Sequence, residues 1–269
     1  DSVALARSSK RPWQTHAAQS VAEFNEMTRR HGMTPVQWAH EIGLLGHGSG
    51  LGHAIFLDSH DWLHWPTRRD LDLIAVTGTN VAHCPTVFSR YGHTLQDLGR
   101  YLRAGITVGL GTDTFPHNMV EEMRVALILA RVAAGYGTSV TSADALHCAT
   151  VGGASALLRD DLGRLAPGAK ADLALVDLAH PMMQPARDPL RSMIYSAAER
   201  AVSDVFVDGQ QVVKDGRVRQ VCVRDQQTGE CTSYQTDTVL SCADATHTLR
   251  DLVGLDVRLD HLIGIYSYA

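Results

Sequence analysis

The sequence predicts an α/β fold with a parallel sheet, followed by a smaller antiparallel β module. Three observations indicate it. Short, almost continuously apolar runs alternate with helical patterns over the first two-thirds of the 269 residues, which is typical of strands buried on both faces of a parallel sheet. From about residue 161, closely spaced turn residues replace this alternation of strands and helices. The composition, with 45% apolar and 20% charged residues, is that of a globular protein.

Four β/α units carry the alternation. The expected strands are residues 12–16, 51–57, 80–85 and 106–111. The expected helices after them are residues 20–32, 66–78, 95–105 and 118–135, with a further helix opening at 34. In the first helix Val21, Phe24 and Met27 share one face, Ser20 is a suitable N-cap, and Gly32 is a suitable stop.

The pattern changes after the fourth unit. Residues 142–158 predict a helix of mixed small residues. Short strands separated by glycine and proline follow, and residues 202–221 predict a hairpin with Asp208 and Gly209 at its turn. We therefore expect a second, antiparallel β module over residues 161–222. No element is predicted for residues 223–269, a C-terminal extension.

Charge and composition exclude several classes of protein. A net charge of −5 argues against a nucleic-acid or anionic-membrane partner, because no basic face is implied. No apolar run approaches the roughly 20 residues of a membrane span, and the first residues hold no apolar signal core. The five cysteines are widely spaced without a Cys-x-x-Cys pair, which favours a reducing cytoplasm. They are Cys84, Cys148, Cys222, Cys231 and Cys242.

Each of the four predicted strands ends with a polar group that can bind a metal ion. These groups are His16, His53, His83 and Asp113. In β/α barrels and open α/β sheets, the carboxyl ends of the strands form the catalytic edge. Imidazole and carboxylate suit a catalytic zinc or a similar divalent ion that activates a water molecule. An aspartate beside that water could take its proton and pass it to the leaving group.

Structural interpretations of the same residues stay open. A single histidine at a strand end is more often a structural residue than a ligand, and Asp113 could cap the turn that follows Gly111 and Thr112. Only the match of four positions, one per unit, favours a site. The remaining histidines of the first 120 residues, apart from His31, are interpreted as surface or loop residues: His40, His47, His60, His64, His93 and His117.

Longer segments resemble the C-terminal part of the amidohydrolase superfamily, in its cytosine deaminase and triazine hydrolase-like branch. The segments are QTHAAQ, LGHAIFLD, VAHCPTVFSRYG, AGITVGLGTDTFPHNMVEEMR, LGRLAPGAKADLALVDL and VFVDGQQVVKDGRV. The resemblance covers roughly residues 12–220 and implies strands five to eight of a metal-dependent (β/α)₈ TIM-type barrel over residues 1–160. It also implies that residues 161–222 form part of a small β-sandwich.

The resemblance also assigns roles. It implies that His16 and Asp113 bind one divalent metal ion, with zinc expected first and iron, cobalt or manganese as alternatives. It implies that His53 contacts the metal-bound water or the substrate, and that Asp113 shuttles the proton. His83 is placed in the substrate pocket together with Gln19. Relatives of this kind are commonly homo-oligomers.

Two departures from the family pattern matter. The His-x-His motif that opens the family's barrel occurs nowhere in the 269 residues, so we expect a piece of a longer chain, or one half of a split enzyme paired with a separate N-terminal half. Many deaminases of this branch carry glutamate three residues after the histidine of strand five, but Gln19 stands here. Glutamine cannot accept a proton at neutral pH, which weakens the case for deamination.

Three hypotheses for the function remain. The first is a metal-dependent hydrolase whose activated water cleaves a C–N or related bond of a small heterocyclic or amide substrate. The second is an aminohydrolase, or deaminase, of a heteroaromatic ring. The third is an incomplete and inactive barrel that serves as a binding or assembly partner. Five loop aromatic residues are candidates for the substrate pocket: Trp62, Trp65, Phe88, Tyr91 and Phe115.

Overall fold

The computed structural model describes residues 2–115, 117–218, 220–224 and 231–235, which fall into two compact units. The first unit comprises residues up to Thr114 together with Met119–Ala169, and the second comprises Phe115–Asn118 and the residues from Lys170 onward. The domain boundary expected after residue 160 stays a prediction. None of the helices in the described residues is both long and apolar enough to cross a lipid bilayer.

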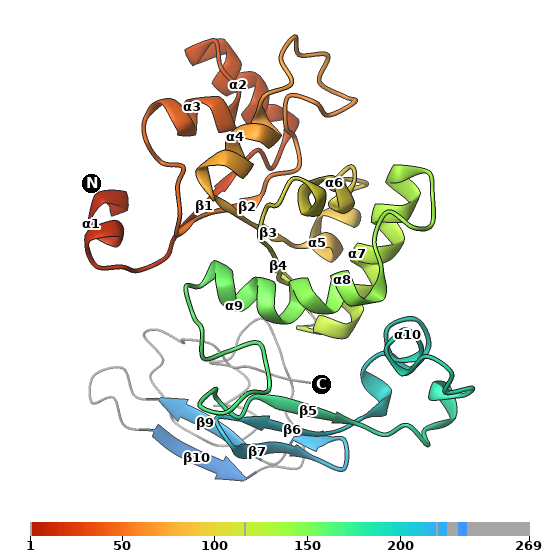
Figure 1. The fold of residues 1–269 in the computed structure, drawn as a ribbon. Helices are drawn as coiled ribbons and strands as arrows, with labels where there is room; N and C mark the ends of the chain where they lie inside the picture. The colour runs from red at the N-terminus through yellow and green to blue at the C-terminus, as the bar shows by residue number, and fades with distance from the viewer. Residues whose placement is uncertain (1, 116, 219, 225–230, 236–269) are drawn as a thin grey trace, which may run out of the picture. The chain divides into compact units, whose positions relative to one another are not determined.

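A four-stranded parallel sheet forms the centre of the first unit (Figure 1). Its strands are β1 (Trp13–Ala17), β2 (Ser49–His53), β3 (Asn80–His83) and β4 (Val108–Leu110), and they pair in sequence order. The side chains of Leu51, Val81 and Val108 are buried at its core. The predicted α/β class with parallel strands is therefore confirmed.

One helix precedes the first strand of this sheet, and further helices follow each of the four strands. They are α1 (Ser2–Ser8) before β1, α2 (Val21–His31) and α3 (Pro35–Glu41) after β1, α4 (Asp70–Thr77) after β2, α5 (Pro85–Ser89) and α6 (Leu98–Arg103) after β3, and α7 (Met119–Ala134) after β4. The unit closes with α8 (Ser142–His147), the π-helical turn η1 (Cys148–Gly152) and α9 (Gly153–Ala156). In Figure 1, α2, α3 and α4 lie beside β1 and β2, whereas α5 to α8 lie beside β3 and β4.

The signals at the ends of α2 act as predicted. The Ser20 hydroxyl accepts a hydrogen bond from the Glu23 N–H at 3.1 Å, which satisfies one of the N–H groups left open at a helix start. Gly32 ends the helix in the left-handed conformation, with φ 66°, a conformation that glycine adopts without steric cost. Thr34 caps α3, and Pro35 occupies its first turn, also as predicted.

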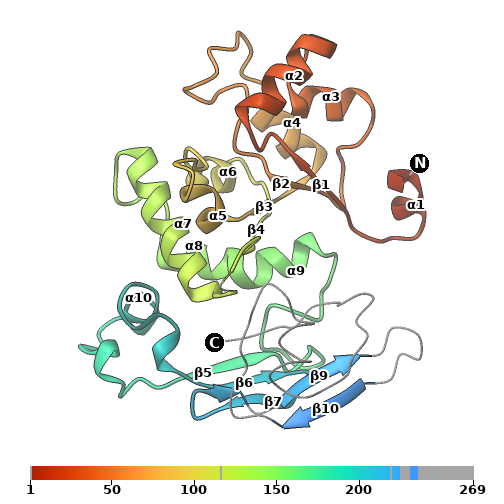
Figure 2. The ribbon, with the colours of Figure 1, turned by 180° about the vertical axis from the view of Figure 1, so that it is seen from behind.

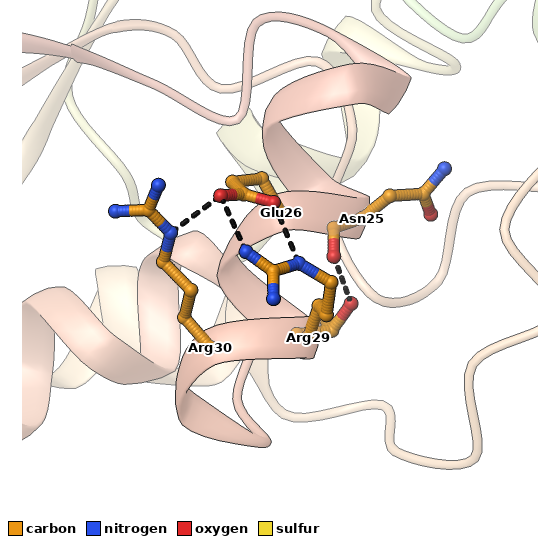
Figure 3. A network of polar contacts seen from close by, with 5 residues as sticks. Asn25, Glu26, Arg29 and Arg30 are labelled. Atoms are coloured by element: carbon orange, nitrogen blue, oxygen red, sulfur yellow. Dashed lines mark hydrogen bonds and ion pairs between the residues drawn. The ribbon is translucent and has the colours of Figure 1, made fainter.

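The exposed face of α2 carries a network of charged side chains (Figure 3). The Glu26 carboxylate accepts hydrogen bonds from Nε and Nη2 of Arg29, both at 2.9 Å, and it also pairs with Arg30. These hydrogen bonds lower the pKa of Glu26 to about 2. Because all three side chains are in contact with water, salt screens their attraction, and the network contributes little to stability.

Two predicted elements are displaced. The strand expected over residues 51–57 ends at His53, because the N–H groups of Ile55 and Phe56 donate to the Ala18 carbonyl beyond the end of β1. The helix expected from residue 66 begins only at Asp70. Buried side chains occupy the connecting segment, where the Asp58 carboxylate accepts hydrogen bonds from the Thr67 hydroxyl and the Arg69 N–H, both at 2.6 Å.

The helix expected over residues 142–158 is present but changes pitch at η1. At this point it lies directly against β4. A β-carbon at Gly152 would stand 2.2 Å from the Val108 carbonyl oxygen, and one at Gly109 would stand 3.1 Å from the Gly153 α-carbon. Glycine on both sides therefore lets the helix backbone approach the strand.

The second unit is antiparallel. Its four-stranded sheet orders β5 (Leu173–Val176), β6 (Val202–Val207), β7 (Gln210–Lys214) and β8 (Arg217–Val218), and β9 (Gln220–Arg224) pairs with β10 (Cys231–Gln235). Short helices lie between β5 and β6: η2 (Pro181–Met183), α10 (Pro189–Ser192), η3 (Met193–Ala197) and η4 (Ala198–Ala201). Figure 2 shows α10 beyond one end of the antiparallel sheet.

The predicted hairpin is confirmed. Asp208 and Gly209, with φ 50° and 79°, form the turn between β6 and β7, and positive φ at both positions is what this kind of tight turn requires. An antiparallel module is therefore present. No element was predicted over residues 223–269, yet β9 ends at Arg224 and β10 lies within that range; the rest of the expected extension lies outside the described residues.

Candidate active site

The four predicted site residues lie at one edge of the parallel sheet. His16 lies one residue before the end of β1, His53 ends β2, and His83 ends β3. Asp113 follows β4 by three residues. Because the strands are parallel, their carboxyl ends meet at this edge, and the loops that leave it surround one region.

His53 lies at the centre of the group. Its Nε2 atom is 3.7 Å from Oδ2 of Asp113, and its ring centroid is 5.0 Å from that of His16. The His53 side chain is only 3% exposed, whereas that of Asp113 is 46% exposed. Burial lowers the pKa of His53, the Asp113 charge opposes this shift, and His16 adds to it. His53 is therefore neutral at pH 7 and can bind through a nitrogen lone pair.

His83 is buried to the same extent as His53. Burial, with a smaller effect of the nearby His53, lowers the pKa of His83 to about 4. The carbonyl of the same residue accepts a hydrogen bond of 3.0 Å from the Gly111 N–H, which ties the end of β3 to the turn that carries Asp113. His83 is thus a neutral polar group in the wall of the site.

The backbone turns sharply where these side chains leave the sheet. His53 and Asp113 have positive φ angles of 78° and 48°, and Ala18 and Ala54 have φ 55° and 45°. Residues other than glycine adopt this conformation at a cost of roughly 1–3 kcal/mol, and such residues cluster at functional sites. The turn after His53 is held by the Tyr101 hydroxyl, which donates a buried hydrogen bond of 2.7 Å to the Ala54 carbonyl.

Gly52 was not predicted as a site residue, yet it shapes the site. A β-carbon at this position would stand 2.7 Å from Cδ2 of His16. Because Gly52 has no side chain, the His16 ring can occupy the space above β2. The sequence does contain a signal for this close approach, because a glycine inside an apolar strand often marks a position where another group comes near the backbone.

Gln19 follows the end of β1 by two residues, at the position where the family pattern carries glutamate. The nearest acidic residue in sequence is Glu23, whose two oxygens accept hydrogen bonds of 2.8 Å from the N–H groups of Ala18 and Gln19. Glu23 therefore holds the backbone after β1 and is engaged as a cap. Among the candidate site residues, Asp113 is the one that carries a carboxylate.

Aromatic rings extend from His53 along the loops after β2 and β3. Phe88 packs against His53 in a T-shaped contact at 4.4 Å, and His93 stacks on Phe88 at 6.5 Å. Trp62 meets His93 edge-on at 5.6 Å and His60 at 5.3 Å, while its own side chain is 55% exposed. His60 lies in a loop as expected, but it is buried. We call Phe88, His93, Trp62 and His60 the aromatic wall.

Trp65 and Tyr91 have different surroundings from Phe88. Trp65 packs edge-on against Phe24 of α2 at 5.7 Å, so it belongs to the packing of the helices. Tyr91 is largely exposed, and Phe115 belongs to the second unit. Of the five candidates, Phe88 has a ring contact with a predicted site residue, His53.

A separate cleft of about 700 Å³ lies at the opposite end of the sheet. Trp13 and Ser49, the first residues of β1 and β2, line it together with side chains of α1 and Arg159. It is remote from the strand ends that carry the histidines, and the amino ends of parallel strands are not where such folds assemble catalytic groups.

The donor atoms fit a divalent ion in kind but do not complete a site. Imidazole and carboxylate are ligands that zinc accepts, and the buried Nδ1 atom of His53 has no hydrogen-bond partner in the described protein. Within the same residues, however, no group of three or more His, Cys, Asp or Glu side chains is arranged to hold a metal ion. Zinc sites use three or four protein ligands, so the described residues alone do not form a complete one.

Comparison with known proteins identifies the family. The sequence profile of the amidohydrolase family matches residues 1–212. The chain belongs to the amidohydrolase family. A curated amidohydrolase relative, the 5-methylthioadenosine/S-adenosylhomocysteine deaminase of Natronomonas pharaonis, is 33% identical over 221 residues, which are 81% of this chain and 49% of the relative. The 5'-deoxyadenosine deaminase of Methanothermobacter thermautotrophicus is 32% identical over 207 residues, which are 76% of this chain and 46% of the relative.

Solved amidohydrolase structures match the fold. An adenosine deaminase from Xanthomonas campestris with bound zinc superposes with a TM-score of 0.72 and 28% identity, over 80% of this chain and 48% of that one. The atrazine chlorohydrolase of Arthrobacter aurescens in complex with zinc superposes with a TM-score of 0.71 and 27% identity, over 80% of this chain and 47% of that one. The chain thus spans about half the length of these relatives. Family and zinc-bound structures together support a divalent metal cofactor, with zinc favoured.

Proposed function

We propose that this chain carries part of the active site of a metal-dependent hydrolytic deaminase, which removes an amino group from a heteroaromatic ring of the adenosine type. The observation that carries the proposal is the convergence of His16, His53 and Asp113 at one edge of the sheet. Membership of the amidohydrolase family and the deaminase names of the curated relatives support the C–N bond as the target.

Each residue has a proposed role. His16 and Asp113 would hold the divalent ion, which supplies an activated water molecule at neutral pH. His53, neutral and buried, would orient that water or the substrate from its position 3.7 Å from Asp113. Asp113 would take the proton from the attacking water and return it to the departing amine. His83 and Gln19 would contact the substrate as neutral hydrogen-bonding groups.

We also propose that β1 to β4 are strands five to eight of an eight-stranded barrel, with the antiparallel module as part of a small β-sandwich. The relatives are about twice as long as this chain, and within the described residues β1 pairs only with β2. Further strands, on this or another polypeptide, would cover that exposed edge and supply the remaining ligands. The complete protein would act on a small molecule, as a homo-oligomer or in a complex with a separate half.

A second candidate reaction displaces a leaving group other than ammonia from a similar ring. Gln19 favours it, because an amide cannot pass a proton to the ring, and the nearby Glu23 is engaged by two backbone N–H groups. The structural similarity to a chlorohydrolase, at 27% identity, is consistent with this reaction. In both candidates Asp113 would take the proton of the attacking water. It would return that proton to the departing amine in the deaminase, whereas chloride leaves as an anion and the proton would pass to solvent.

The test measures metal content and product release on two preparations. One is the chain alone, and the other is the chain completed by the N-terminal half of the Natronomonas pharaonis deaminase. We expect the completed form to bind zinc and to release ammonia from 5'-deoxyadenosine or 5'-methylthioadenosine. Asp113→Asn should lower that rate by roughly 10²- to 10⁴-fold. The matched control is Asp72→Asn, an exposed carboxylate on α4, which should change nothing.

The outcomes separate the hypotheses. Release of chloride from a chlorinated triazine without release of ammonia from any amino-substituted ring would favour the second candidate. Full activity of Asp113→Asn would remove the proposed mechanism. Absence of metal binding and of hydrolysis in both preparations would favour the interpretation of the chain as a binding or assembly partner.

A further inference from the structure

The short helix α5 touches three of the four strand ends that carry the candidate site. It begins directly after His83 and Cys84 at the end of β3. From this helix Phe88 packs against His53 at the end of β2. Arg90, the C-cap of α5, donates a hydrogen bond of 2.8 Å from Nη1 to the hydroxyl of Thr114, the neighbour of Asp113. The placement of α5 therefore affects both members of the His53–Asp113 pair.

The contact with Phe88 orients the His53 imidazole. The two ring centroids are 4.4 Å apart and the ring planes are inclined by 63°, a T-shaped arrangement that aromatic pairs favour. Nδ1 of His53 is buried and has no hydrogen-bond partner in the described protein. The plane of the imidazole thus depends on packing, and Phe88 supplies the nearer of its two ring contacts in that part of the chain.

The position of Phe88 depends in turn on the start of α5, which is weakly capped by its own residues. Its N-cap, Cys84, makes no side-chain hydrogen bond to the helix, and the next residue, Pro85, has no N–H. The first N–H group of the helix is therefore that of Thr86, and it needs an acceptor. Glu122 of α7 provides one, because its Oε2 atom lies 3.1 Å from the Thr86 nitrogen.

Glu122 is placed unusually for a carboxylate in a helix. Its side chain is 1% exposed, and acidic residues are rarely buried so completely without a specific partner. Burial raises the pKa of Glu122, while the hydrogen bond from the Thr86 backbone opposes that shift. Its acceptor oxygen is aimed at the start of a five-residue helix, so the hydrogen bond from Thr86 offsets part of the cost of desolvating this carboxylate.

We propose that Glu122 is a positioning residue, which anchors α5 so that Phe88 holds the His53 imidazole in its orientation opposite Asp113. Glu122 does not touch the reacting groups; it acts through Thr86 and Phe88. The inference rests on the proposed function only for the statement that the His53–Asp113 pair reacts. The anchoring itself can be measured on a protein with no activity.

The test compares Glu122→Gln with Glu122→Met. Glutamine keeps an oxygen acceptor for the Thr86 N–H, whereas methionine fills a similar volume without one. The readout is the nuclear Overhauser effect between the ring protons of His53 and Phe88, in protein with isotope-labelled histidine and phenylalanine. We expect the methionine variant to lose most of this signal and the glutamine variant to keep it. In the completed enzyme, kcat should fall at least 10-fold for methionine with little change in KM, and glutamine should restore it.

Two results would overturn the proposal: an undiminished His53–Phe88 signal in Glu122→Met, or equal loss of the signal in both variants. If Glu122→Met does not fold, the variant Phe88→Leu tests the proposal instead. This variant keeps the cap of α5 and removes the ring, and an unchanged His53 spectrum together with unchanged kcat would show that α5 does not orient the imidazole. A completed enzyme that hydrolyses nothing, but shows the expected signals, contradicts the proposed function and leaves the positioning role supported.

Discussion

Nε2 of His53 lies 3.7 Å from Oδ2 of Asp113, with the histidine buried and the aspartate half exposed. The pair joins the ends of β2 and β4, two strands that do not pair with each other. Its two members therefore differ in access: Asp113 can exchange protons with a substrate or water at the surface of the site, whereas His53 presents a neutral ring from within.

A double-mutant cycle should show that His53 and Asp113 act as one unit. In the completed enzyme we expect His53→Asn and Asp113→Asn each to lower kcat by roughly 10²-fold or more. The double variant should be little worse than the poorer single one, because residues of one catalytic unit are non-additive. Steady-state rates of the four proteins measure the coupling. Strictly multiplicative losses would mean that the two side chains act independently.

Gly52→Ala should disturb the His16 ring. The new β-carbon would lie 2.7 Å from Cδ2 of His16, so the ring or the strand must move. We expect a loss of about 1–3 kcal/mol of unfolding free energy, and loss of the His16–His53 ring contact by nuclear magnetic resonance. Gly137→Ala is the control, because its β-carbon would meet nothing within 4 Å. Wild-type spectra for Gly52→Ala would refute the packing argument.

Tyr101→Phe should weaken the turn that follows His53. The variant removes the buried hydroxyl that donates to the Ala54 carbonyl at 2.7 Å and leaves that carbonyl without this donor. The expected cost is about 1–2 kcal/mol, measured by urea unfolding. Hydrogen exchange should also rise at the N–H of Ala54, which donates to the Ala17 carbonyl. The same change at Tyr91, an exposed residue, should leave both measurements within error.

Asp70 should make the protein more stable as the pH falls toward 5. Burial, with a smaller effect of the Asp58 charge, raises the pKa of Asp70 from 3.8 to about 6. A carboxyl group whose pKa is higher in the folded state binds its proton more tightly there. Its contribution to stability is therefore complete below pH 4 and is lost as the pH rises through about 6. The shift corresponds to at most about 3 kcal/mol.

Asp70→Asn isolates this effect, because asparagine does not titrate. It keeps an oxygen for the Thr34 hydroxyl and the Gln37 amide, which both donate to Oδ1 of Asp70. The difference in unfolding free energy between wild type and variant should move in favour of the wild type between pH 7 and pH 5. A constant difference across that range would show that Asp70 titrates normally in the folded protein.

Local signals in the sequence predicted the elements that depend on nearby residues. The caps Ser20 and Gly32 and the turn at Asp208 and Gly209 were found where expected, because each satisfies backbone groups a few residues away. The strand over 51–57 was predicted too long, since its apolar residues continue past His53 while the backbone hydrogen bonds turn to Ala18. Apolar side chains indicate that a segment is buried, but they do not indicate which carbonyl groups accept hydrogen bonds from its backbone N–H groups.

Apolar periodicity and turn residues are local properties of a chain, and they were enough to predict the α/β class, the order of the strands along the chain and the four polar residues at or near the strand ends. Which of those residues meet, and which side chains surround them, became visible in the three-dimensional fold. Three contacts join residues from different β/α units: the His16 ring over Gly52, the ring of Phe88 against His53, and the hydrogen bond from Thr86 of α5 to Glu122. Such contacts depend on distances across the sheet, which no spacing along the chain encodes.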